Sequence, residues 1–140
     1  MPPYNWAGFY LIDPTDPNFL IVGPFAGSFT PNKRIRLTVG LSGLAATTKR
    51  VVVVQDVSKD PRYLVGSSMV KSEIVVPLFV GKKLVAELDI ESYFADTFTK
   101  PEQEFVEAAT FLRFVPSLHL CPWSFLHYAK NRTLDHSVWQ

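Results

Sequence analysis

The chain has 140 residues, of which 47% are hydrophobic and 19% are charged, and its formal net charge is +1. This length suits one globular domain with a buried core, and the interspersed charges form no basic stripe of the kind that binds nucleic acid. We find neither an apolar stretch long enough to span a bilayer nor the start of a signal peptide, so we expect a cytoplasmic protein without nucleic-acid or membrane partners. A single cysteine, Cys121, excludes an intramolecular disulfide and a zinc site built from several thiolates.

The first part of the chain is typical of short strands separated by turns. Residues 5–12 alternate with the two-residue period of a strand, and a turn rich in aspartate and proline separates them from a second strand at 19–22. These strands should form a hairpin, after which the glycine and proline residues within 23–28 favour a loop. We expect a strand over 34–39, then a glycine-bounded turn and a short helix within 40–49, whose N-terminal amides could face a ligand.

The second part is organised around a hairpin. Four consecutive valines within 50–55 predict a strand that is central in its sheet or buried on both faces. Residues 56–71 form a long connection, which we expect to act as a lid. Two β-type runs at 72–80 and 83–92 then flank a tight turn at Gly81, and this pattern predicts an antiparallel hairpin.

Three acidic residues share one face of the second run. The two-residue period places Glu87, Asp89 and Glu91 on one side and the apolar residues on the other. Like charges at this spacing repel only modestly in water, so an exposed sheet face is one interpretation. A cleft in which some of these acids bind a cationic group is the other.

A capping-box pattern, Thr99 with Glu102, predicts a helix that covers the sheet and ends by about Val115. We therefore expect one domain over 1–115 and an atypical aromatic tail over 116–140. The tail contains the cysteine and all three histidines, but no pair of them has the spacing of a helical zinc motif, and prolines interrupt the segment. We favour irregular packing over a metal site, and predict no metal and no other cofactor.

Six short motifs, taken together in order and spacing, resemble the GAF-domain free methionine-(R)-sulfoxide reductases and their GAF-like relatives. They are NWAGFY at 5–10, VGPFAG at 22–27, GLSGLAA at 40–46, VQDV at 54–57, SEIVVPL at 72–78 and LDIES at 88–92. The resemblance implies an α+β fold with a central antiparallel sheet, flanking helices and a ligand cleft under the long loop.

The resemblance also implies which residues bind the ligand. In these reductases carboxylates hold the amino-acid end of the substrate and aromatic residues hold its side chain. The matching positions here are Glu73, Asp89, Glu91, Trp6 and Tyr10. An aromatic wall beside anionic groups suits an ammonium-bearing ligand. The competing interpretation is a core tryptophan and a solvated acidic face.

The catalytic pattern of the family is not kept. Its cysteine positions match Ser42 and Gly66, and a third falls near Thr30 or Pro31, so we predict no catalytic residue. A serine cannot replace a thiolate in this chemistry, because its hydroxyl is far less acidic and forms no stable disulfide. The sulfur of Cys121 lies outside the matched region.

The family also carries helices before the first strand, where this chain has only residues 1–4. One face of the sheet should therefore lack its usual cover and expose apolar surface. The tail or a second subunit could cover that face, and a truncated gene product is a further alternative.

We predict a GAF-like domain that binds or senses a small molecule, possibly free methionine or its sulfoxide, without a thiol redox centre. One alternative is a working free methionine-(R)-sulfoxide reductase that uses Cys121. Another is an interaction module that forms a homodimer.

Overall fold

The computed structural model describes residues 4–114, so the expected tail at 116–140, with its cysteine and histidines, lies outside the described residues. The fold is α+β, as expected, with six strands in one antiparallel sheet. The strands are β1 (Tyr4–Ile12), β2 (Phe19–Ala26), β3 (Arg34–Arg36), β4 (Val52–Val54), β5 (Ser72–Val80) and β6 (Lys83–Ser92). The helices are α1 (Gly40–Thr48), the 3-10 helix η1 (Val57–Lys59) and α2 (Lys100–Phe114). No helix among residues 4–114 is long and apolar enough to cross a membrane.

The strands follow the order β3-β2-β1-β6-β5-β4, so the two expected hairpins meet at the centre of the sheet. Antiparallel pairing of β1 with β6 places Trp6 opposite Glu91, Gly8 opposite Asp89 and Tyr10 opposite Glu87. Directly opposed residues of an antiparallel pair point to the same face. The first strand of the chain therefore contributes aromatic side chains beside the acidic side of the last strand.

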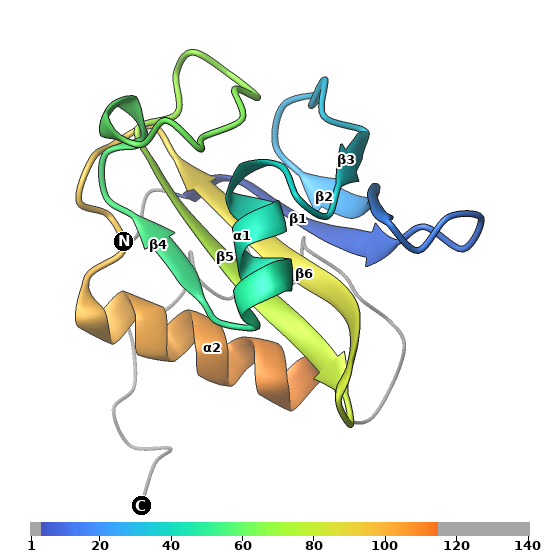
Figure 1. The fold of residues 1–140 in the computed structure, drawn as a ribbon. Coiled ribbons are helices and arrows are strands. Elements are labelled where there is room, and N and C mark those ends of the chain that lie inside the picture. The colour runs from blue at the N-terminus through green and yellow to red at the C-terminus, as the bar shows by residue number, and fades with distance from the viewer. Residues whose placement is uncertain (1–3, 115–140) are drawn as a thin grey trace, which may run out of the picture.

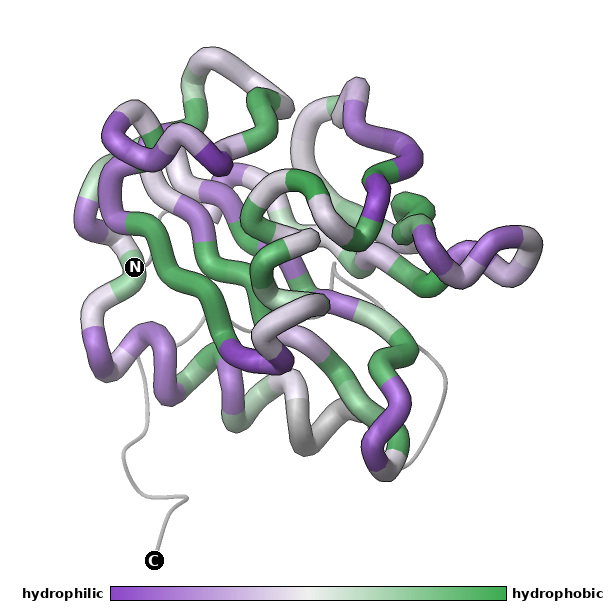
Figure 2. Tube along the Cα trace, viewed as in Figure 1, coloured by the Kyte–Doolittle hydropathy of each residue, from purple (hydrophilic) through white to green (hydrophobic). Residues whose placement is uncertain are grey.

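The two faces of the sheet have different partners. Helix α2 covers one face (Figure 1), and its Val106 packs there with Phe9, Ile74, Leu88 and other apolar residues in the main hydrophobic core. Helix α1 lies on the opposite face. In Figure 2 the hydrophobic colour follows β4 and the middle of β5 beside α1, in keeping with a second apolar cluster in that region.

Two expectations about strands need correction. Strand β2 continues to Ala26 instead of ending at residue 22, because its last residues pair with β1. Strand β3 pairs only with Phe19–Ile21, which leaves the outer edge of β2 free at Pro24. A proline lacks the N–H that a strand neighbour would require, and a free edge tolerates it. The strand expected over 34–39 ends at Arg36, where the amide of Val39 turns back to donate to the Arg36 carbonyl at 2.9 Å.

The valine-rich strand β4 lies at the edge of the sheet, so of the two alternatives predicted for it the central position is wrong and burial on both faces is the one that fits. Its side chains nevertheless pack on both sides. Val52 and Val54 are buried in the cluster beside α1, and Val51 and Val53 pack against the main core. An edge strand whose two faces are both covered has the same continuous apolar pattern as a central one.

Candidate functional site

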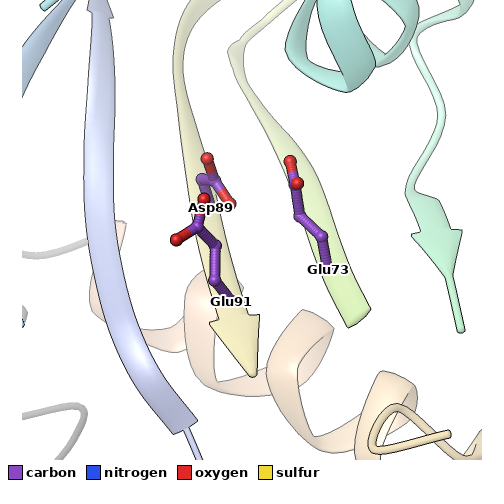
Figure 3. Close-up of side chains that lie close together, drawn as sticks. All are labelled: Glu73, Asp89 and Glu91. Carbon is purple, nitrogen blue, oxygen red and sulfur yellow. The ribbon is translucent and has the colours of Figure 1, made fainter. Parts of the chain in front are cut away.

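The site is built around three carboxylates on the face of the sheet that bears α1. Glu73 on β5 is paired directly with Glu91 on β6, and Asp89 lies one same-face position further along β6. One oxygen from each residue lies within 4.8 Å of the others. Figure 3 shows the three side chains, from two neighbouring strands, gathered in one place. We call Glu73, Asp89 and Glu91 the acidic cluster.

The acidic cluster is buried, so the interpretation of a solvated acidic face is wrong. Glu73 and Asp89 are each 5% exposed, and Glu91 is partly buried. Within residues 4–114 no lysine or arginine side chain forms an ion pair with any of the three. The Oδ1 atom of Asp89 has no hydrogen-bond partner among the described residues. A buried charge without a partner is costly, so these carboxyls are expected either to hold protons or to bind a cation.

The pKa values of the three carboxyls are all raised, which favours their protonated forms. Burial raises the pKa of Asp89 well above its usual range, and the neighbouring Glu73 and Glu91 carboxylates add to this shift. Burial and the carboxylate of Glu91 raise the pKa of Glu73 in the same way. Burial raises the pKa of Glu91 to about 7. The cluster is therefore partly protonated near neutral pH, and an arriving cation would displace these protons.

Trp6 and Tyr10 lie beside the acidic cluster and belong to a separate apolar cluster on this face of the sheet. Both are buried, and their ring centroids lie 6.1 Å apart. The indole N–H of Trp6 donates to the carbonyl of Ser28 at 3.1 Å, and the Tyr10 hydroxyl donates to the carbonyl of Asn32 at 2.8 Å. Their polar atoms thus hold the segment between β2 and β3, while their rings pack in an apolar cluster with Leu20 and Ile35.

Gly8 makes room for the ring of Trp6. A Cβ atom at Gly8 would lie 2.2 Å from the ring carbon Cη2 of Trp6 and 2.8 Å from the Cβ of Phe25, so a larger residue would force the ring to move. Gly8 is also directly opposite Asp89. The glycine therefore allows the indole to lie along β1 near the acidic residues of β6.

The positions that match family cysteines also lie around these acids. A Cβ atom at Gly66 would lie 3.3 Å from Oε1 of Glu91 and 4.0 Å from the Thr30 hydroxyl oxygen. Ser42 is buried in α1, and its hydroxyl opposes the rise in the pKa of Glu87. None of residues 4–114 is a cysteine, so the described part of the chain places no sulfur at these positions.

The segment expected to be a lid reaches the site through Gly66. The side-chain amide of Asn32 donates to the carbonyl of Val65 at 3.3 Å, which joins this segment to the one between β2 and β3. Tyr63 of the same segment is affected by the cluster, since burial and then the charges of Glu91 and Glu73 raise its pKa. The location fits the expectation, whereas the opening and closing of a lid stays a prediction.

All five expected ligand-binding residues are thus brought together, and their role as ligand contacts stays a prediction. Sequence reasoning did not include Glu87, Tyr63 or Asn32 among them. The two-residue period had placed Glu87 on the correct face, but no sequence signal distinguished a buried carboxyl from an exposed one. The three oxygens of the acidic cluster are also hard ligands of the kind that Ca²⁺ or Mg²⁺ prefers, so a metal ion could occupy the same place as an ammonium group.

Comparison with known proteins identifies the class of fold. The GAF domain family matches residues 4–112, and the chain belongs to this family. Its sequence is 38% identical to the free methionine-R-sulfoxide reductase of Saccharomyces cerevisiae over 104 residues, which cover 74% of this chain and 57% of that protein. The chain therefore spans a little over half of the length of this relative.

Two solved structures extend the similarity to free methionine-R-sulfoxide reductases. The type II enzyme from Thermoplasma acidophilum has a TM-score of 0.72 and 31% identity, with 77% of this chain and 74% of that chain covered. The enzyme from Neisseria meningitidis in complex with its substrate has a TM-score of 0.71 and 33% identity, with 75% of this chain and 62% of that chain covered.

The buried acids predict that the empty domain loses stability as the pH rises. Carboxyl groups whose pKa is raised by folding keep protons that the unfolded chain has already lost. Their contribution to the free energy of unfolding is therefore fully present at low pH and is lost as the pH rises. This loss begins near the ordinary glutamate pKa of 4.5 and ends near the raised pKa values, which are about 7 for Glu91 and about 8 for Glu87. We expect the urea midpoint to fall between about pH 5 and about pH 8, and Asp89→Asn to reduce this fall.

Carboxylates outside the site act in the opposite direction at lower pH. Hydrogen bonds from Thr15, Ser58 and Arg62 lower the pKa of Asp13, Asp56 and Asp60, respectively, so their contributions to stability are lost only in acid. A urea midpoint that stays constant or rises from about pH 5 to about pH 8 would show that the acidic cluster is charged in the empty protein.

Proposed function

We propose that this GAF domain binds free methionine-(R)-sulfoxide, the substrate of the reductases that it resembles. The observation that supports the proposal is the acidic cluster, which is buried, lacks a cationic partner within residues 4–114 and has raised pKa values. A primary ammonium group supplies both the positive charge and the hydrogen-bond donors that these oxygens need. The side chain of the ligand would lie against Trp6 and Tyr10.

The relatives favour this ligand over an unrelated small molecule. Proteins described as free methionine-R-sulfoxide reductases are similar to this chain both in sequence and in structure. A reductase interpretation therefore has more support than that of a sensor for some other compound. The positions implied by the resemblance are also the positions that the fold brings together around Asp89.

Reduction of the bound sulfoxide is a second step, and it needs a thiol. A thiol attacks the sulfoxide sulfur and takes its oxygen, which forms a sulfenic acid and releases methionine. A second thiol then condenses with the sulfenic acid to give a disulfide and water. Within this chain only Cys121 could supply the first sulfur. We therefore propose binding by the described residues, and reduction only if a thiol reaches the acidic cluster.

Binding should depend on Asp89. We expect L-methionine (R)-sulfoxide to bind the parent in isothermal titration calorimetry, and Asp89→Asn to weaken binding about ten- to a hundredfold, because a charge-assisted hydrogen bond is lost. Asp96→Asn is a matched control, since Asp96 is exposed and its left-handed backbone suits asparagine. If the parent binds nothing at millimolar concentration, or if Asp89→Asn binds as tightly as the parent, the proposed site is wrong.

A cysteine at position 66 should give the domain the chemistry that it lacks. We expect the parent to show no reduction of L-methionine (R)-sulfoxide by dithiothreitol above the rate without protein. Gly66→Cys should show it, because its thiol would stand beside Glu91 at the bound ligand and dithiothreitol would reduce the sulfenic acid formed.

Ser68→Cys provides the control for this gain of activity, because it puts a cysteine on an exposed position of the same segment. Equal rates for Gly66→Cys and Ser68→Cys would show that position 66 does not face the ligand. Turnover by the parent that disappears in Cys121→Ser would instead place the active thiol in the chain beyond residue 115.

A further inference from the structure

Glu87 is a buried carboxyl that none of the expected roles uses. It is fully buried, and neither of its carboxylate oxygens has a hydrogen-bond partner of normal geometry among the described residues. Its neighbours across the sheet are Tyr10 on β1 and Pro77 on β5. Buried polar groups in folded proteins are nearly always hydrogen-bonded, so two oxygens without a donor require an explanation.

The unpartnered oxygens of Glu87 lie next to the acidic cluster on the same face of β6. Asp89 is the next residue on the same face of β6, and its Oδ1 atom also lacks a partner. Three buried acceptors thus lie on adjacent same-face positions. The charge of Glu87 raises the pKa values of both Asp89 and Glu73, so Glu87 lies close enough to interact electrostatically with these two carboxyls.

Among residues 4–114, the elements around Glu87 offer the Ser42 hydroxyl as a donor and no cation. The Tyr10 hydroxyl already donates to the carbonyl of Asn32. Helix α1 carries no ionisable residue, and although its Ser42 hydroxyl opposes the rise in the pKa of Glu87, no hydrogen bond of normal geometry joins the two side chains. The ionisable groups that face Glu87 are therefore Asp89, Glu73 and Tyr10, none of which is a cation.

We propose that Glu87 is a fourth, inner ligand-binding residue, which together with Asp89 receives the primary ammonium group of the bound amino acid. This inference rests on the proposed function and adds an orientation to it. The ammonium end of the ligand lies at Asp89 and Glu87, beneath α1. The opposite end lies toward Glu91, Gly66 and the segment between β2 and β3, where a reacting thiol would be needed.

Proton release follows from this arrangement. Burial raises the pKa of Glu87 to about 8, so this carboxyl is mostly protonated in the empty protein at pH 7. An ammonium group beside it lowers that pKa and favours the carboxylate. Binding of the ligand at neutral pH should therefore release a proton from Glu87, in addition to any protons released by the acidic cluster.

Calorimetry of three proteins tests the inference. The heat of binding of L-methionine (R)-sulfoxide at pH 7 is measured in buffers of different ionisation enthalpy, which gives the number of protons released. We expect Glu87→Gln to release about one proton fewer than the parent and to bind about tenfold more weakly. Glu107→Gln should match the parent, because Glu107 is exposed on α2 at the other face of the sheet.

A variant that removes the unpartnered acid altogether separates binding from folding. We expect Glu87→Leu to raise the melting temperature of the empty protein, because a buried carboxyl without a partner is lost, and to reduce the stabilisation that the ligand provides. These measurements keep the inference testable if Glu87→Gln does not fold.

Two results overturn the inference, and they are distinct. If the parent and Glu87→Gln bind with the same affinity and the same proton release, or if Glu87→Leu keeps the full ligand-induced rise in melting temperature, Glu87 does not contact the ligand and the proposed function stands. If the parent does not bind L-methionine (R)-sulfoxide at all, the proposed function fails and the inference fails with it.

Discussion

The burial of carboxyl groups without cationic partners is the constraint on which the rest of the site depends. In most domains the acidic side chains of a strand face water, where repulsion between them costs little. Here helix α1 and the segment around Gly66 cover Glu73, Asp89 and Glu87, and burial then raises their pKa values. Such an arrangement reduces stability in the empty protein, and it favours any ligand that brings a positive charge and several hydrogen-bond donors.

The sheet topology makes this arrangement possible with few elements. Pairing of β1 with β6 at the centre of the sheet puts aromatic residues next to acids that are about eighty residues away in the chain. The opposite face of the same strands packs against α2 and forms the main core. The alternation of side chains along a strand thus separates a stabilising apolar face from a polar face on which ligand contacts can be placed. Trp6 and Tyr10 lie on the same face as the acids, where their rings pack in a separate apolar cluster with Leu20 and Ile35.

Local pattern predicted the hairpins, the helix before residue 115 and the common face of Glu87, Asp89 and Glu91, because these features depend on neighbours within a few residues. The resemblance supplied Glu73, Trp6 and Tyr10, which lie far apart in sequence. The exposure of the acids was not predictable, since it depends on how α1 and the segment 56–71 pack over the sheet. The edge position of β4 was missed for a related reason: an edge strand covered on both faces carries the same valine run as a central one.

The acidic cluster of this GAF domain is expected to hold protons in the absence of ligand and to exchange them for an ammonium group. Carbon-13 NMR titration of the aspartate and glutamate carboxyl carbons, with and without L-methionine (R)-sulfoxide, tests this exchange most directly. At least one carboxyl should titrate at about pH 7 or above in the unliganded protein and at a clearly lower pH in the complex. Carboxyl carbons that all titrate near about pH 4, unchanged by the ligand, would contradict it.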